Sequence, residues 1–281
     1  MRATANRYTL TPTPQGNEVP DHDTDLRLSF DAAADLYLKA RPQYPEALYR
    51  DLLETCAPGS KARLLEVGCG PGVATRPIAE HGYQIDALDP GEALLERAAA
   101  HLDGLNVRLI SADFESLDPP ATPYDLIYSA TAWHWTDPDT RYTRAHAMLQ
   151  PGGYLTFWEA RHVLVADGDP IFVDLQPVYD EIEEGLPPGA SLPSPKDMPT
   201  REEEITASGL FEIVRVERYD WETRYSASAY VDLLKTFSNH ILMAPWKQAR
   251  LFSAIEAYVA ARNDEPIRRH WGCVLHIARK R

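Results

Sequence analysis

The chain has 281 residues, a formal net charge of −14 at pH 7, 44% hydrophobic residues and 25% charged residues. This composition is typical of a globular protein with a full core, and the acidic balance argues against a general nucleic-acid-binding protein. No apolar run reaches the roughly 18 residues that suggest a membrane span, so we expect no membrane partner. The scattered Cys56, Cys69 and Cys273 are typical of reduced thiols, and we expect a cytoplasmic protein.

The first 60 residues divide into a tail and two helices. We expect residues 1–28 to form a flexible tail, because they are polar and rich in Thr and Pro. In the segment 29–60, a helical pattern over Phe30–Ala40 should end before Pro42, since a residue before proline disfavours the helical conformation. Pro45 is then suited to the first position of a second helix.

Residues 61–160 alternate between short apolar runs and helical patterns. The predicted strands are Arg63–Val67, Gln84–Leu88, Val107–Ile110, Tyr124–Ser129 and Gly153–Trp158. The helices between them are predicted through Ile78 up to Gly82, over Glu92–His101 and over Thr140–Leu149. Strands that alternate with helices indicate parallel βαβ units, so we expect an α/β, Rossmann-like, doubly wound core.

Residues 161–281 carry the remaining elements. Two strands, Phe211–Trp221 and Trp271–Ala278, would complete a mostly parallel seven-stranded sheet. Helical patterns cover Asp169–Gly185 with an interruption at Pro177, Ser226–Ser238 and Trp246–Arg262. The last two do not fit a minimal sheet layer, so we expect helical lid insertions over the binding site.

A loop rich in Pro, Gly and Ser is predicted over Gly185–Pro199. Thr200 and Glu203 after it have the spacing of a capping box. This spacing predicts a helix that runs to Ser208.

A glycine-rich turn follows the first predicted strand and opens a helix. Its glycines allow a tight turn and a close approach of the backbone to a ligand. Dinucleotide-binding enzymes use a related G-x-G-x-x-G turn, but the position of their third glycine holds Val73 here. Glu66, two residues before the first glycine, would repel a pyrophosphate and attract an ammonium group. The turn therefore indicates a ligand that carries an ammonium group.

This E-x-G-x-G-x-G turn resembles the first motif of the class I S-adenosylmethionine-dependent methyltransferases. Its residues are Glu66, Gly68, Cys69, Gly70 and Gly72. The resemblance implies that they bind S-adenosyl-L-methionine, which leaves S-adenosyl-L-homocysteine as the product.

Three further segments resemble motifs of the same family. Asp89, which precedes Pro90 after the second strand, matches the acidic residue that binds the ribose hydroxyls, and a carboxylate can accept two hydrogen bonds from a diol. Asp113 and Phe114 resemble the adenine-binding segment. The resemblance implies that Asp113 accepts from the exocyclic amine and that Phe114 packs on the ring. The turn Leu149–Gly153 matches the one that precedes the fifth strand.

The pattern Y-x-x-x-R-P-x-Y-P begins at Tyr37 and contains Arg41. It looks like the N-terminal segment of the small-molecule, type 11 or trans-aconitate methyltransferase-like, subgroup. The resemblance implies that this segment closes over the cofactor, with Arg41 on the methionine carboxylate and Tyr37 beside the sulfonium. The alternative is that its tyrosines only pack the helix onto the core.

The segment after the fourth strand resembles the A-x-H-W pattern of the same subgroup. It lies where open α/β sheets bind ligands, and Ser129 and Ala130 would contact the methionine part of the cofactor. His134 is a candidate general base, because an imidazole titrates near neutrality. The alternative is that His134 and Trp135 only fix the loop.

Other candidates are single residues. His240 in the predicted lid is a second catalytic candidate, and Glu159 and His162 follow the fifth strand. Aromatic residues that either line a pocket for a flat acceptor or belong to the core are Trp158, Trp221, Tyr225, Phe237 and Trp246. Histidines without close pairs predict no metal site.

Together the motifs predict methyl transfer from S-adenosylmethionine to an O, N or C atom of a small-molecule acceptor, preferably one with an aromatic ring, by a monomer or homodimer. An NAD(P)-dependent oxidoreductase with a Rossmann domain and an inactive methyltransferase-like binding protein are the alternatives. A nucleic-acid methyltransferase is opposed by the charge and by the absence of an N/D-P-P-Y/F motif after the fourth strand.

Overall fold

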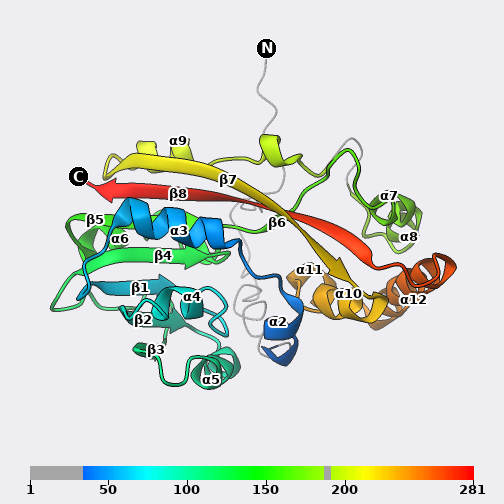
Figure 1. Ribbon diagram of the computed structural model, residues 1–281, viewed down its shortest axis with the longest axis horizontal. Helices are drawn as coiled ribbons and strands as arrows, with labels where there is room; N and C mark the ends of the chain where they lie inside the picture. Colours follow the sequence, from blue (N-terminus) through cyan, green and yellow to red (C-terminus); the bar gives the residue numbers. More distant parts are fainter. Residues whose placement is uncertain (1–33, 187–190) are drawn as a thin grey trace, which may run out of the picture.

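The computed structural model describes residues 34–186 and 191–281, so the predicted tail 1–28 and the start of the predicted helix Phe30–Ala40 lie outside the described part. The strands form one sheet in the order β3-β2-β1-β4-β5-β8-β6, with β7 paired to β8 (Figure 1). The predicted α/β class and mostly parallel sheet are confirmed. One two-residue strand, β6 (Arg161–His162), is additional to the seven predicted.

Five parallel strands form one half of the sheet. They are β1 (Arg63–Val67), β2 (Gln84–Asp89), β3 (Val107–Ser111), β4 (Tyr124–Ala130) and β5 (Leu149–Trp158). β1 pairs in parallel with β2 on one side and with β4 on the other. The chain order reverses beside β1, and open sheets bind ligands at the carboxyl ends of their strands at such a point.

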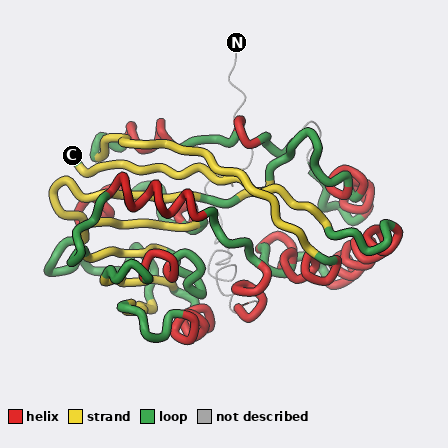
Figure 2. The backbone as a smooth tube through the Cα atoms, in the orientation of Figure 1, coloured by secondary structure: helices red, strands yellow, loops and turns green. Residues whose placement is uncertain are grey.

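Helices cover both faces of this half (Figure 2). On one face, α3 (Glu46–Cys56), α4 (Thr75–Ala79) and α5 (Glu92–His101) pack apolar side chains into a first core cluster. On the other face, α6 (Arg141–Met148) and α9 (Glu202–Ala207) contribute to a second cluster. Successive residues of β1 belong to different clusters, because side chains alternate between the faces of a strand. The predicted doubly wound arrangement is therefore confirmed.

Two long strands form an antiparallel ribbon that extends beyond the parallel strands. β8 (Ile267–Lys280) pairs with β5 near its carboxyl end and with β7 (Phe211–Tyr225) along its whole length. Figure 1 shows the ribbon reaching toward α10 and α12. Both strands are longer than the predicted Phe211–Trp221 and Trp271–Ala278, because charged residues at their outer ends obscure the apolar pattern.

A group of helices lies around the outer end of this ribbon (Figure 1). It consists of α2 (Ala34–Ala40), α7 (Ile171–Asp174), α8 (Gln176–Glu181), α10 (Ala227–Leu234), α11 (Ser238–Ile241) and α12 (Pro245–Ala261). Apolar side chains of all these helices except α11 belong to or pack against a third core cluster, and α2 packs on α10. α2 is thus joined to α10, a helix from the last third of the chain. No helix in the described ranges is long and apolar enough to cross a bilayer.

Two predicted helix starts are wrong. α9 begins at Glu202 with Arg201 as its N-cap, and the Thr200 hydroxyl donates to the Glu202 carboxylate, so the predicted capping box of Thr200 and Glu203 does not form. The helix starts too late for Thr200 to occupy the cap. Pro45 is the N-cap of α3 rather than its first residue.

Two predicted helices are interrupted. The segment Asp169–Gly185 breaks at Leu175 and not at Pro177, because this proline lies in the first turn of α8, where a missing N–H costs little. The segment Ser226–Ser238 breaks after Leu234, where the hydroxyl of Thr236 donates to the Leu233 carbonyl. The resulting turn enters the site described below.

Candidate functional site

The glycine-rich turn between β1 and α4 is held against the end of β2. The N–H groups of Gly68 and Cys69 both donate to the Leu88 carbonyl. Gly68 has a φ of +70°, and a Cβ atom there would lie 2.3 Å from the Cβ of Ala132. Gly70 has a φ of +53°, but a Cβ atom there would meet no protein atom within 4 Å. Gly68 therefore allows close packing within the protein, whereas Gly70 leaves open space.

Asp89 at the end of β2 fixes this turn. One carboxylate oxygen accepts from the N–H of Gly70 at 2.8 Å, and the other accepts from the N–H of Gly91 at 2.9 Å. The side chain is buried. Asp89 thus links the glycine turn to the start of α5, and its negative charge faces the space beside Gly70.

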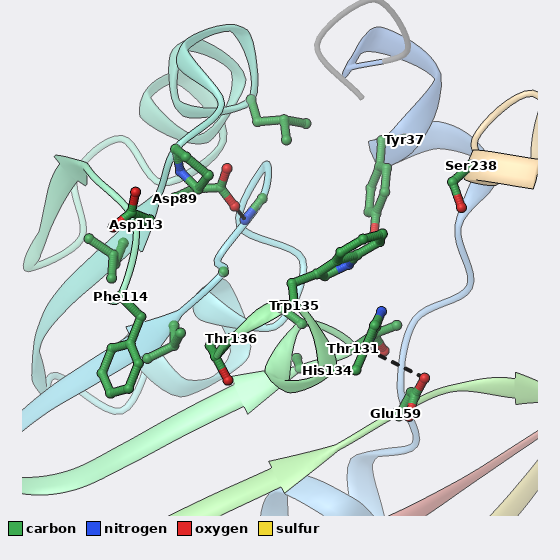
Figure 3. Close-up of a pocket in the computed structure, with 18 of the residues that line it drawn as sticks. Tyr37, Asp89, Asp113, Phe114, Thr131, His134, Trp135, Thr136, Glu159 and Ser238 are labelled. Carbon is green, nitrogen blue, oxygen red and sulfur yellow. Dashed lines mark hydrogen bonds and ion pairs between the residues drawn. The ribbon is translucent and has the colours of Figure 1, made fainter. Parts of the chain in front are cut away.

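A cavity of about 280 Å³ opens at the carboxyl ends of the parallel strands (Figure 3). It brings together ten of the residues predicted to form the site. These are Tyr37, Arg41, Gly68, Gly70, Asp89, Pro90, Asp113, Phe114, Ala130 and His134. In Figure 3, Asp89 and Asp113 lie at one end of the cavity, while Tyr37, His134 and Glu159 lie at the other.

Four other predicted residues, Glu66, Cys69, Gly72 and Ser129, lie around this cavity. Glu66 and Cys69 line a smaller adjoining space of about 40 Å³, which shares Gly68 and Gly70 with the main cavity. Glu66 accepts a hydrogen bond from the Tyr128 hydroxyl at 2.8 Å, and its burial raises its pKa to about 8.

Gly72 and Ser129 line neither space. A Cβ atom at Gly72 would press on the Leu102 side chain. The hydroxyl of the fully buried Ser129 donates to the Val67 carbonyl at 2.8 Å and ties β4 to β1. Both residues therefore contribute to the packing behind the cavity wall and do not face a ligand.

Arg41 joins α2 to the turn that follows α10. Its Nε donates to the Thr236 hydroxyl at 2.9 Å, and its Nη2 donates to the Thr236 carbonyl at 2.7 Å. The guanidinium also lies 4.8 Å from the ring centre of Tyr37 and 4.2 Å from that of Phe237. The expected pairing of Arg41 with a ligand carboxylate stays a prediction, and the structure adds a second role as a link across the cavity.

Asp113 and Phe114, in the segment after β3, differ in how far they are exposed to the cavity. Asp113 faces the cavity, and one of its carboxylate oxygens accepts from the N–H of Ser116 at 2.8 Å. The ring of Phe114 is 2% exposed and packs against Trp133. Phe114 therefore offers little surface to a ligand, and its predicted stacking on a ring stays a prediction.

His134 and Glu159 form a pair at the cavity wall. His134 lies in a short 3₁₀ turn after β4 (Trp133–Trp135), and Glu159 directly follows β5. His134 Nδ1 is 3.5 Å from Glu159 Oε1 (Figure 3), and the other oxygen of Glu159 accepts from Arg161 at 2.6 Å. Burial lowers the pKa of His134, although 30% of its side chain is exposed, and the Glu159 carboxylate opposes this shift. The Glu159 carboxylate therefore faces Nδ1 of His134, and the role of His134 as a general base stays a prediction.

Thr131 is a cavity residue that the sequence did not reveal. Its φ is +57°, an unusual value for a β-branched residue. Its hydroxyl is hydrogen-bonded to the Tyr44 hydroxyl at 2.7 Å and accepts from the N–H of Ala160 at 3.1 Å. It therefore joins the ends of β4 and β5 to the segment before α3. No local sequence pattern predicts a positive φ at a threonine.

His240 and His162, two other candidates, lie away from the cavity. His240 Nε2 is 3.2 Å from the Tyr179 hydroxyl, and its Nδ1 is 3.0 Å from the Asn239 side-chain oxygen. Burial lowers the pKa of His240 to about 4 and that of His162 to about 2. Neither residue lines the main cavity, so neither reaches a ligand there in this conformation.

The five aromatic candidates occupy different positions: one lines the cavity, three belong to the core or pack against it, and one is exposed. Phe237 lines the main cavity, whereas Trp158 and Tyr225 are buried in the core clusters and Trp221 packs against them. Trp246 is 58% exposed. Trp135, which was not among these five candidates, also lines the main cavity (Figure 3). Among the described residues, no group of three or more His, Cys, Asp or Glu side chains could hold a metal ion.

The part of the chain that forms this site is similar to known methyltransferases. Residues 64–153, from β1 to the start of β5, match the sequence model of a family described as a methyltransferase domain. An uncharacterized methyltransferase of Mycobacterium tuberculosis is 30% identical over 159 residues, which cover 52% of this chain and 63% of that protein. A malonyl-[acyl-carrier protein] O-methyltransferase of Ilyobacter polytropus is 35% identical over 113 residues, or 38% and 42% of the two chains. These alignments therefore span less than two thirds of the relatives.

Solved structures resemble the whole fold. A protein of Anaeromyxobacter dehalogenans assigned as a type II methyltransferase has a TM-score of 0.59 at 24% identity, over 85% of this chain and 97% of that one. The cyclopropane synthase MmaA2 of Mycobacterium tuberculosis has a TM-score of 0.52 at 18% identity, over 94% and 100% of the chains. At these identities the likeness concerns the fold alone.

Proposed function

We propose that this chain, a member of the class I S-adenosylmethionine-dependent methyltransferases, binds S-adenosylmethionine in the main cavity and transfers its methyl group to a small molecule. The observation that carries the proposal is the Gly70–Asp89 cradle. Gly70 leaves open space where any other side chain would project, and Asp89 presents a buried carboxylate beside it. The family match covers this cradle and favours a methyltransferase over a dinucleotide-dependent oxidoreductase.

The residues present fit the chemical groups of the cofactor. Asp89 would accept from the ribose hydroxyls, Asp113 from the adenine amine, and Glu66 would attract the ammonium group from the adjoining space. Arg41 would pair with the carboxylate. A related fold, the mycolic acid cyclopropane synthase CmaA1, was solved with S-adenosylhomocysteine. The bound cofactor supplies a methyl group already activated by its sulfonium.

The chain's own task is alignment and exclusion of water. α2 and the turn before α11 cover the cavity, since Tyr37, Arg41, Phe237 and Ser238 line its wall and Arg41 binds Thr236 across it. This is the proposed lid. Holding two reactants in line contributes roughly 7–11 kcal/mol to a bimolecular reaction. A lid that excludes water is therefore sufficient for an acceptor that needs no deprotonation.

For an acceptor that must lose a proton, His134 is the proposed general base. Glu159 faces Nδ1, so a proton on Nδ1 leaves Nε2 as the basic atom. A neutral imidazole at pH 7 can accept a proton from a hydroxyl or ammonium group.

The pairing predicts the direction of a pKa change. In Glu159→Gln the pKa of His134 should fall further below its ordinary value, because the carboxylate that raises it is lost while burial remains. Titration of the His134 ring by NMR measures this without an acceptor. Glu92→Gln, on the exposed start of α5, is the matched control and should leave the titration unchanged. An unchanged or raised pKa in Glu159→Gln would contradict the pairing.

Glu66 predicts a pH dependence of cofactor binding. Burial holds its pKa at about 8, so it must lose a proton before it can pair with an ammonium group. Affinity for S-adenosylhomocysteine should therefore rise with pH, by up to about tenfold per unit, and level off near pH 8. In Glu66→Gln, the affinity should depend on pH only through the titration of the ligand's own amino group. A pH profile identical in both proteins would remove Glu66 from the binding site.

Methyl transfer itself is tested with S-adenosylmethionine that carries a deuterated methyl group. The protein is incubated with a defined library of small phenols, amines and carboxylic acids, and products are identified by mass spectrometry. We expect a labelled small molecule that forms with the native protein and not with Gly70→Ala. His134→Gln should retain S-adenosylhomocysteine binding and lose turnover of acceptors that must be deprotonated. Cofactor binding without any labelled product would favour a binding protein instead.

A further inference from the structure

Arg269 is a buried charge for which the proposed reaction has no use. It lies near the outer end of β8 and is 7% exposed. Its Nη1 donates to the Tyr230 hydroxyl at 2.7 Å, and its Nε is buried without a hydrogen-bond partner. Among the described residues, no carboxylate forms an ion pair with Arg269. Asp169 accepts a hydrogen bond from the backbone N–H of Arg268, but its carboxylate pairs with Arg262. Buried guanidinium groups normally have an anionic partner.

Aromatic rings surround this charge. The guanidinium carbon lies 4.4 Å from the ring centre of Trp271, 5.3 Å from Phe237, 5.7 Å from Tyr230 and 5.9 Å from Phe172. The rings attract a cation, but they add no negative charge. Together they form an aromatic box around the guanidinium.

The titratable neighbours of Arg269 do not neutralise it. His162 touches the same Phe172 ring, and its Nε2 is also buried without a partner. Burial and the charge of Arg269 hold the pKa values of His162 and His240 low, so both are neutral at pH 7. The box therefore carries one net positive charge and polar groups without partners, which is complementary to an anion.

The box lies directly behind the wall of the proposed site. The Phe237 ring separates the two arginines, with Arg41 at 4.2 Å and Arg269 at 5.3 Å from its centre, and it lines the main cavity. Trp271 lines the smaller space beside Glu66. A rotation of Phe237 would connect Arg269 with the cavity. Phe237 belongs to the short turn between α10 and α11 rather than to a helix, and such a rotation would have to break its ring contacts with Trp271 and His240.

We propose that Arg269 binds an anionic group of the methyl acceptor, so that the substrates are small molecules that carry a carboxylate. This inference rests on the proposed function and narrows its substrate class. The carboxylate accepts from the guanidinium in a planar, two-point contact, Phe237 and Trp271 contact the apolar part of the molecule, and the charge left unpaired in the free protein gains its partner on binding.

The test compares acids with their neutral amides on the protein saturated with S-adenosylhomocysteine. Benzoate and benzamide, phenylacetate and phenylacetamide, and 3-phenylpropionate with its amide are titrated by NMR or calorimetry. At least one acid should bind about tenfold or more tightly than its amide, because only the carboxylate brings a negative charge and two acceptor oxygens to the guanidinium. Arg269→Met should abolish that preference.

Arg268→Met is the matched control. Arg268 is the preceding residue on β8, and its side chain is partly exposed and bonded to the Asp167 carbonyl and Glu222. It should retain both S-adenosylhomocysteine binding and the preference for the acid. If no acid binds better than its amide, or if Arg269→Met keeps the preference, Arg269 is only a link between β8 and the helices. If the native protein does not bind S-adenosylhomocysteine at all, the proposed function is contradicted instead.

Discussion

Gly70→Ala is expected to lose S-adenosylhomocysteine binding while the protein stays folded. The new methyl group meets no protein atom within 4 Å and projects into the space beside Asp89 that the cofactor would occupy. An added group in a filled site costs roughly 1–3 kcal/mol, or about fivefold to 150-fold in affinity. The positive φ of +53° adds only about 1–2 kcal/mol of backbone strain to folding. Calorimetric titration and thermal unfolding measure the two effects separately.

Two glycines provide the controls. Gly82, in the turn after α4, has a φ of +86° and equally open surroundings, but it is remote from the cavity. Gly82→Ala should show the strain on unfolding and normal ligand affinity. Gly68→Ala should lose both stability and binding, because its Cβ atom would overlap with Ala132. Normal binding by Gly70→Ala would mean that the open space at Gly70 is not the ligand site.

Asp89→Ala should weaken S-adenosylhomocysteine binding by at least about a hundredfold. The expected loss comes from two hydrogen bonds to a charged group, each worth roughly 1.5–3 kcal/mol. The substitution also leaves the N–H groups of Gly70 and Gly91 without their acceptor, so the turn itself should loosen. Titration of the variant with S-adenosylhomocysteine and with homocysteine separates the ribose contact from the methionine part.

Asp125→Ala distinguishes binding from folding. Asp125, at the opposite end of β4, also accepts a backbone N–H, that of Arg63 at 2.8 Å, and it is absent from the cavity wall. Its removal should lower the unfolding temperature and leave affinity unchanged. If Asp89→Ala loses no more affinity than Asp125→Ala, Asp89 only supports the fold.

The parallel half of the sheet was predictable because its signals are local. β1 and β4 are short apolar runs bounded by turns, and the glycine turn after β1 has a spacing that few other structures require. The ligand end of the sheet follows from the strand order alone. This is why residues as distant in sequence as Gly70, Asp113 and His134 could be assigned to one cavity before any contact was known.

The features that were not predictable depend on contacts between distant segments. The end of β7 and the start of β8 are stabilised by pairing with each other, and no apolar alternation marks them. The bond of Arg41 to Thr236 and the positive φ of Thr131 depend on the docking of α2 and the segment after it. The pairing of His134 with Glu159 joins the ends of two neighbouring strands. The sequence placed both residues at the ligand side, but only the register of β4 and β5 brings them into contact.

The central claim is that the cavity binds S-adenosylmethionine, and calorimetric titration of the purified protein tests it most directly. S-adenosylmethionine, S-adenosylhomocysteine and NAD are titrated in parallel under one set of conditions. The proposed function predicts micromolar binding of both adenosyl ligands and no binding of NAD. Absence of binding for both adenosyl ligands, or binding of NAD in their place, would contradict it.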